Sequence, residues 1–190
     1  MASRLMQATF IVAVLGLSWL AMMAVHELGH VLHALVSGGS VVQLVLGPLD
    51  ISRTDVAPNP HPQFVAWGGA LWGVMIPIVL LAIVRLMVPK YAYLTAFFAG
   101  FCLIANGLYL TAGSVTGIGD AGDLLRNGAA MWQLIFFGVP ATVAGFWLWN
   151  GLGPHFGFGV AGGKVDSRAA LAVVIAFIAV IATETLLSSR

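Results

Sequence analysis

The chain has 190 residues, of which 60% are hydrophobic and only 8% are charged. About a quarter of the residues of a soluble domain are charged, so this composition excludes an ordinary soluble protein and favours one compact bundle of membrane helices. The formal net charge is +1 and no basic run is interleaved with aromatic residues, so we expect no nucleic-acid partner. Residues 1–190 are therefore expected to form a single domain embedded in a lipid bilayer.

The first apolar segment contains a charge-free run from Ala8 to Val25. Such a run is about as long as is needed to cross the hydrocarbon core of a bilayer. It is longer than the apolar part of a typical signal peptide, and no small-x-small cleavage site precedes His26. The sequence therefore predicts a retained transmembrane helix over about Leu5 to Val36, ended by Ser37-Gly38-Gly39.

A small β-hairpin and four further membrane helices are predicted after this first helix. Apolar residues recur at every second position from Val42 to Leu46, and Gly47-Pro48 marks a turn before Leu49–Ser52, so the hairpin is expected over Val41–Ser52. Residues 113–127 are too polar to span and predict a loop leading into a short helix. The other spans are expected over about residues 63–88, 91–112, 130–150 and 168–187. The predicted class is an all-α membrane protein with about five transmembrane helices and one hairpin.

The sequence His26-Glu27-Leu28-Gly29-His30 lies inside the first predicted membrane helix. Residues four apart share one face of a helix, so His26 and His30 can direct their imidazoles at one metal ion. Glu27 is then placed to take a proton from a metal-bound water that attacks a carbonyl, and to return one to the leaving amine. Ionisable groups at membrane depth are costly and usually functional, which favours a zinc site over a buried polar cluster satisfied by neighbouring helices.

A catalytic zinc ion normally has three protein ligands and one position left for water. His33 is excluded as the third ligand because it lies about 10 Å further along the same helix than His26. The remaining candidates are the carboxylates of the second half of the chain, namely Asp120, Asp123, Asp166 and Glu184. Asp166 falls in a polar linker and Glu184 near a helix end, which leaves Asp120 and Asp123.

Asp120 and Asp123 also fit a purely structural interpretation. They precede Leu124 and Leu125 at the spacing of a helix-capping arrangement, with Asp120 as the N-cap. Capping and metal binding are compatible, because a carboxylate at a helix start is held rigidly.

Together these features resemble the site-2 protease family of intramembrane zinc metalloproteases. The resemblance is carried by the HELGH sequence in a membrane helix, the hairpin-like segment, a glycine-rich helix with a proline, and a later aspartate-glycine element; it covers roughly Val12 to Leu125. Members carry an aspartate ligand in an Asp-Gly-Gly pattern followed by one charged and two apolar residues, to which the sequence from Asp120 to Leu125 is similar. The resemblance implies Asp120 as the third ligand, Zn²⁺ as cofactor and a transmembrane protein as substrate.

The chain departs from the family pattern before and within this second motif. The first glycine is replaced by Ala121, and the asparagine and prolines that usually precede the aspartate are absent from residues 111–119. The nearest amide is Asn106, which could orient a substrate carbonyl or form a hydrogen bond between helices. No sensor domain is recognised, so regulation is expected from the loops or from a membrane partner.

Two functions follow from these residues. The first is an intramembrane zinc endopeptidase in which Glu27 activates the water. The alternative is a non-proteolytic metal-binding scaffold or transporter-like protein of the same fold. Glu27 favours the endopeptidase, because a scaffold needs no base beside two histidines.

Overall fold

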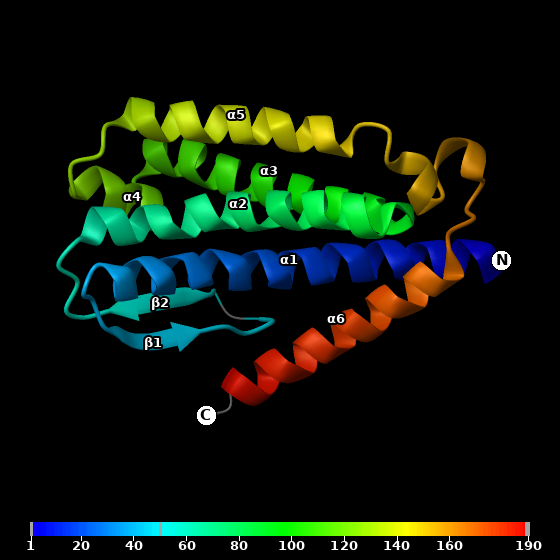
Figure 1. Cartoon of the computed structure of the whole chain (residues 1–190), viewed down its shortest axis with the longest axis horizontal. Helices are drawn as coiled ribbons and strands as arrows, with labels where there is room; N and C mark the ends of the chain where they lie inside the picture. Colours follow the sequence, from blue (N-terminus) through cyan, green and yellow to red (C-terminus); the bar gives the residue numbers. More distant parts are fainter. Residues whose placement is uncertain (1, 50, 189–190) are drawn as a thin grey trace.

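The computed structural model describes residues 2–49 and 51–188, in which long helices dominate (Figure 1). Five helices of this part of the chain are long and apolar enough to cross a membrane: α1 (Ala2–Val36), α2 (Pro62–Met87), α3 (Ala92–Thr116), α5 (Met131–Trp149) and α6 (Ser167–Ser188). The predicted class, an all-α membrane protein with five candidate spans and a small hairpin, is confirmed.

Shorter elements connect these helices. Strands β1 (Val41–Val45) and β2 (Arg53–Val56) form an antiparallel pair, and the short helix α4 (Gly119–Arg126) follows α3. Three 3₁₀ turns complete the order: η1 (Pro89–Tyr91), η2 (Gly153–Phe156) and η3 (Gly159–Ala161).

Four of the long helices, α1, α2, α3 and α5, run side by side along the molecule (Figure 1). The hairpin lies along the C-terminal half of α1, and α4 lies at the same end of the bundle. Helix α6 packs on the N-terminal part of α1 and slopes away from the other helices. The hairpin and α4 thus lie at the end of the bundle that also holds the HELGH sequence.

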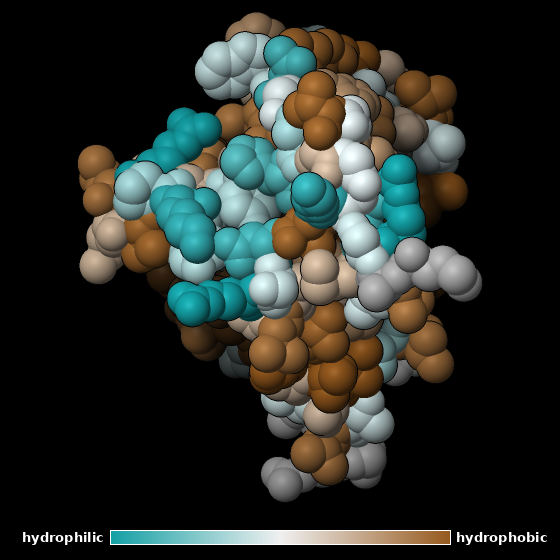
Figure 2. Space-filling view, turned by 90° about the vertical axis from the view of Figure 1, so that its right-hand side faces the viewer, coloured by the Kyte–Doolittle hydropathy of each residue, from teal (hydrophilic) through white to brown (hydrophobic). Residues whose placement is uncertain are grey.

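The opposite end of the molecule is polar and its flanks are apolar (Figure 2). Lys90 forms an ion pair with Asp166 there, with 3.1 Å between Nζ and Oδ2. Asp166 also accepts hydrogen bonds from the backbone N–H groups of Arg168 and Ala169 at the start of α6. The hydrogen bond from the Ala169 N–H, followed by those from Lys90 and the Arg168 N–H, holds the pKa of Asp166 below its usual value. A polar end and apolar flanks are the distribution expected of a bundle that spans a bilayer.

Two apolar clusters hold the bundle together. One surrounds Phe10 and Phe156 and joins α1, α3, η2 and α6. The other surrounds Leu110, Leu124 and Leu134 and joins α2, α3, α4 and α5. The second cluster fixes the short helix α4 against the long helices.

Helices α3 and α5 approach each other through glycines. A Cβ atom added at Gly107 would lie 2.5 Å from the carbonyl oxygen of Gly138, and one at Gly145 would lie 2.7 Å from the carbonyl oxygen of Gly100. Small residues of this kind let membrane helices pack backbone against backbone.

The structure corrects two details of the predicted elements. The expected second strand at Leu49–Ser52 is wrong: β1 pairs instead with β2, in a register that joins Leu44 to Thr54. Residues 46–52 form a longer connection, in which Leu49 is 97% exposed; Asp50 lies outside the described residues. The pairing is shifted because Thr54 contacts α1, which local alternation does not reveal. Helix α3 also continues to Thr116, beyond the expected end at residue 112.

Replacing Gly107 by alanine is expected to destabilise the bundle. The added methyl group overpacks the contact with α5, and overpacking costs about 1–3 kcal/mol, more than the roughly 1 kcal/mol that alanine gains over glycine in a helix. Thermal unfolding in detergent should show a lower midpoint. The control is Gly153→Ala, where the nearest atom to the new Cβ is 3.6 Å away and little change is expected; equal midpoints for the two variants would contradict the prediction.

Candidate metal centre

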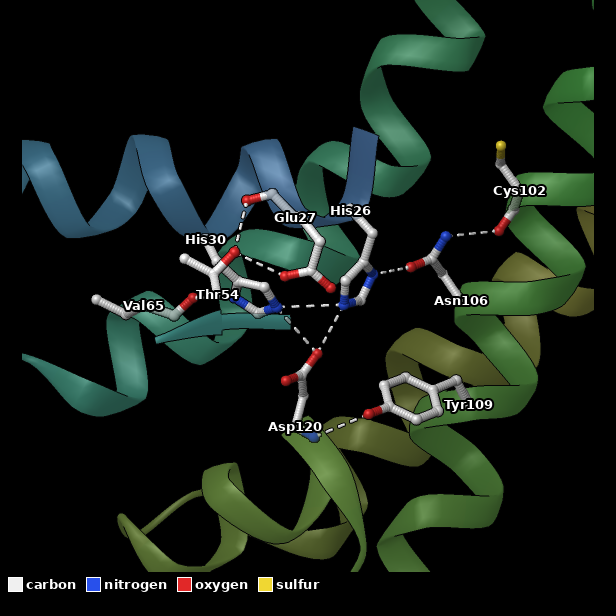
Figure 3. Close-up of polar contacts among 9 residues, drawn as sticks. All are labelled: His26, Glu27, His30, Thr54, Val65, Cys102, Asn106, Tyr109 and Asp120. Carbon is white, nitrogen blue, oxygen red and sulfur yellow. Dashed lines mark hydrogen bonds and ion pairs between the residues drawn. The ribbon is translucent and has the colours of Figure 1, made fainter. Parts of the chain in front are cut away.

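The two histidines of the HELGH sequence point the same way from α1. His26 and His30 are buried, and their Nε2 atoms lie 3.2 Å apart (Figure 3). Their spacing of four residues brings both imidazoles to one face of the helix, as predicted.

Asp120 completes the group from α4. Its Oδ2 atom lies 2.8 Å from Nε2 of His26 and 3.2 Å from Nε2 of His30 (Figure 3). The next residue, Ala121, and Leu124 are fully buried in the cluster below, so α4 cannot shift without disturbing the core. Within the described residues, His26, His30 and Asp120 are the only three such side chains placed to hold a metal ion.

The second nitrogen of each imidazole is already engaged. Nδ1 of His26 donates to Oδ1 of Asn106 at 2.7 Å, and the amide nitrogen of Asn106 donates to the carbonyl of Cys102 at 2.9 Å. Nδ1 of His30 donates to the carbonyl oxygen of Val65 at 2.9 Å. Metal-binding histidines typically use their other nitrogen in this way, which fixes the ring and leaves the Nε2 lone pair for the metal.

Three electron-pair donors therefore converge within 3.2 Å of one another. Burial alone would raise the pKa of Asp120, but its hydrogen bonds with His26 and His30 hold that pKa well below its usual range. Two imidazole nitrogens face the carboxylate oxygen of Asp120. Such an arrangement requires positive charge at its centre, supplied by a proton or by a metal ion.

Glu27 lies beside the three residues and is only 4% exposed. The hydroxyl of Thr54, on β2, donates to its Oε2 atom at 2.7 Å (Figure 3). A buried carboxylate needs such a partner, and this one also ties the hairpin to α1.

A cavity of about 950 Å³ opens onto these side chains. Elements α1, α2, α3, α4 and the hairpin all contribute to its walls. Consecutive residues of the hairpin, Ile51 to Val56, line it. Because side chains alternate across a strand, consecutive lining residues mean that the backbone edge of β2 faces the cavity.

At Gly69, bare backbone of α2 lies against the site. A Cβ atom at Gly69 would lie 2.5 Å from Nε2 of His26 and would also collide with His30. At the neighbouring residue of α2, Gly68, the backbone packs directly against the backbone of Gly29 in α1. These glycines bring α2 close enough for the Val65 carbonyl to reach His30.

Other residues considered from the sequence lie outside the group. His33 stacks on Phe64 at 4.1 Å between ring centroids and donates to its carbonyl oxygen. Asp123 is exposed and pairs with Arg126 at 2.6 Å. The predicted capping role of Asp120 is wrong, because Ile118 occupies the N-cap position and no side chain caps this helix. The bonds that Asp120 makes to the histidines take its carboxylate away from the helix end.

Three contacts of the site were not predicted: those of Thr54, Val65 and Tyr109. The ring of Tyr109 packs against His26, and its hydroxyl oxygen accepts a hydrogen bond from the backbone N–H of Asp120. It lies three residues after Asn106, so one helix face carries both, and this spacing is a signal that the sequence does contain. The Val65 contact is made by a backbone carbonyl and leaves no signal in residue types.

Comparison with known proteins gives no relative for this chain: no family model, no curated protein and no solved structure matches it.

Proposed function

We propose that the chain is an intramembrane zinc endopeptidase of the site-2 protease type, acting on membrane proteins. The observation that carries the proposal is the convergence of His26, His30 and Asp120, with Glu27 beside them, in a cavity among apolar helices. The retained Glu27 favours a hydrolase over a metal-binding scaffold or transporter-like protein.

The donor set fits zinc. Tetrahedral zinc with bonds of about 2.0–2.1 Å places its ligand atoms about 3.3 Å apart. The three atoms of this site are 2.8–3.2 Å apart, close to that spacing. When bound, zinc lowers the pKa of a coordinated water to about 7 and polarises a carbonyl group.

Glu27 is the general base of the proposed reaction. Thr54 holds its Oε2 atom, so the carboxylate has a fixed direction while Oε1 makes no hydrogen bond with the described residues. Glu27 takes the proton of the attacking water and delivers it to the nitrogen of the leaving amine.

The cavity fits a substrate in extended conformation. A carbonyl within an intact helix is hydrogen-bonded and shielded, so the substrate helix must unwind before hydrolysis. The edge of β2 offers backbone groups to such an extended segment, in the manner of strand addition. Apolar side chains of α1, among them Trp19, Met22 and Met23, line the cavity and suit a transmembrane sequence.

The ligand assignment predicts different outcomes for two neighbouring aspartates. Asp120→Ala should reduce the zinc content of the purified protein to a small fraction of wild type, because it removes one of three ligands. Asp123→Ala makes the same chemical change on the exposed side of α4 and should keep the metal. Atomic emission analysis of both variants measures this, and the reverse result would move the ligand to Asp123.

Removing the base should stop the reaction without removing the metal. Glu27→Gln is expected to lower cleavage at least about a hundredfold, the usual contribution of general acid–base catalysis, at wild-type zinc content. Cleavage is followed with a pool of fluorescence-quenched apolar peptides in detergent micelles. Glu184→Gln is the matched control, since Glu184 is a buried glutamate of α6 outside the cavity. Normal processing by the Glu27→Gln variant would show that Glu27 is not the base, and equal absence of cleavage in wild type and variant would leave the scaffold as the better function.

Asn106 is expected to support the metal through His26. Asn106→Leu removes the acceptor of the Nδ1 proton, and losses of this kind lower metal affinity about 10–100-fold. Thr111→Val on the same helix is the control, because the Thr111 hydroxyl is buried and makes no hydrogen bond among the described residues. Competition with a zinc chelator gives both affinities; equal affinities would show that the Asn106 contact is only structural.

A further inference from the structure

The hydroxyl group of Tyr109 lies at the metal centre, and the reaction described so far gives it no role. Tyr109 comes from α3 and lines the same cavity as His26 and Asp120. Its ring packs edge-on against the imidazole of His26, with 5.9 Å between centroids and 75° between planes (Figure 3). Its hydroxyl points towards the backbone nitrogen of Asp120, in the first turn of α4 (Figure 3).

The hydroxyl oxygen accepts one hydrogen bond and keeps its proton available. The backbone N–H of Asp120 donates to it at 3.2 Å. A phenol can accept and donate at the same time, so this contact leaves the O–H of Tyr109 free to donate. No acceptor among the described residues receives that proton.

Packing holds the hydroxyl at this position. Gly119 has a φ angle of +59°, and a Cβ atom there would collide with the Tyr109 oxygen. A glycine therefore lets the phenol reach the turn that carries Asp120. The ring is fixed from the other side by His26.

Among the described residues, the neutral side chains that bond to His26 and Glu27 donate elsewhere or to Glu27 itself. The Thr54 hydroxyl donates to Glu27, and the Asn106 amide donates to the Cys102 carbonyl. Tyr109 contacts both His26 and Asp120, lines the cavity, and has a hydroxyl that donates to no group in the part of the chain that the structure describes.

We propose that Tyr109 is a further catalytic residue, whose O–H donates a hydrogen bond to the substrate carbonyl oxygen as negative charge develops on it. This role rests on the proposed function. The water oxygen bonds to the carbonyl carbon, the electron pair of the C=O π bond moves to the carbonyl oxygen, and the water proton goes to Glu27. When the C–N bond breaks, the carbonyl re-forms and Glu27 gives its proton to the amine nitrogen. Tyr109 keeps its proton throughout, and its hydrogen bond is strongest where the oxygen carries most charge.

The test is Tyr109→Phe, which keeps the ring and removes only the hydroxyl. We expect wild-type zinc content, a nearly unchanged KM and a kcat lowered about a hundredfold, the effect of deleting one donor to an oxyanion. A phosphinic peptide with apolar side chains carries a tetrahedral, charged oxygen in place of the carbonyl. Its Kd, measured by calorimetry in micelles on zinc-loaded protein, should rise by a similar factor. Tyr93→Phe is the control: Tyr93 is on the same helix, and its buried hydroxyl makes no hydrogen bond with the described residues.

Different results overturn different statements. A Tyr109→Phe variant with wild-type kcat and phosphinate affinity overturns the catalytic role. A variant that loses zinc also overturns it, because Tyr109 then acts only by positioning Asp120. If wild-type protein cleaves no better than Glu27→Gln, the endopeptidase function itself fails and the role of Tyr109 fails with it. Thermal unfolding of each variant shows that the comparison is made between folded proteins.

Discussion

Ionisable side chains buried among apolar helices are costly without partners, and this constraint organises the site end of the molecule. His26, Glu27 and His30 lie buried on α1, where an unpaired polar group is costly. Each forms hydrogen bonds with a different set of elements: His26 with α3 and α4, Glu27 with β2, and His30 with α2 and α4. The hydrogen bonds to these three side chains of α1 therefore also hold the hairpin and α4 in place.

Close backbone packing makes these contacts possible. The Val65 carbonyl reaches His30 because Gly29 and Gly68 let α1 and α2 meet without side chains between them. On the other side, α4 is held by buried Leu124, so Asp120 is directed at the histidines by a rigid turn. The polar network and the apolar core thus depend on each other: the core sets the distances, and the network selects the arrangement in which His26, Glu27 and His30 each have a hydrogen-bond partner.

The membrane class and the number of spans could be predicted from the sequence because long apolar runs bounded by charges are a strong local signal. The shared direction of His26 and His30 followed from helix geometry alone. Contacts between segments distant in the sequence were harder to predict. The place of β2 was missed because it depends on Thr54 reaching Glu27, and the capping role assigned to Asp120 was wrong because its carboxylate bonds to α1. Asn106 was recognised as a polar group in need of a partner, but which partner it has is a property of the packed bundle.

The bare backbone at Gly69 limits how this site can diversify. Position 69 of α2 cannot be exchanged, since any larger residue there meets the imidazoles. Changes in the selectivity of the cavity are then expected at other lining residues, such as Trp19, Met22 and Met23 of α1 and the loop before β2. That loop is long, and Leu49 and Ile51 within it are largely exposed, so it can accept insertions and substitutions without disturbing the helices. A designer seeking altered selectivity would vary this loop and leave Gly69 untouched.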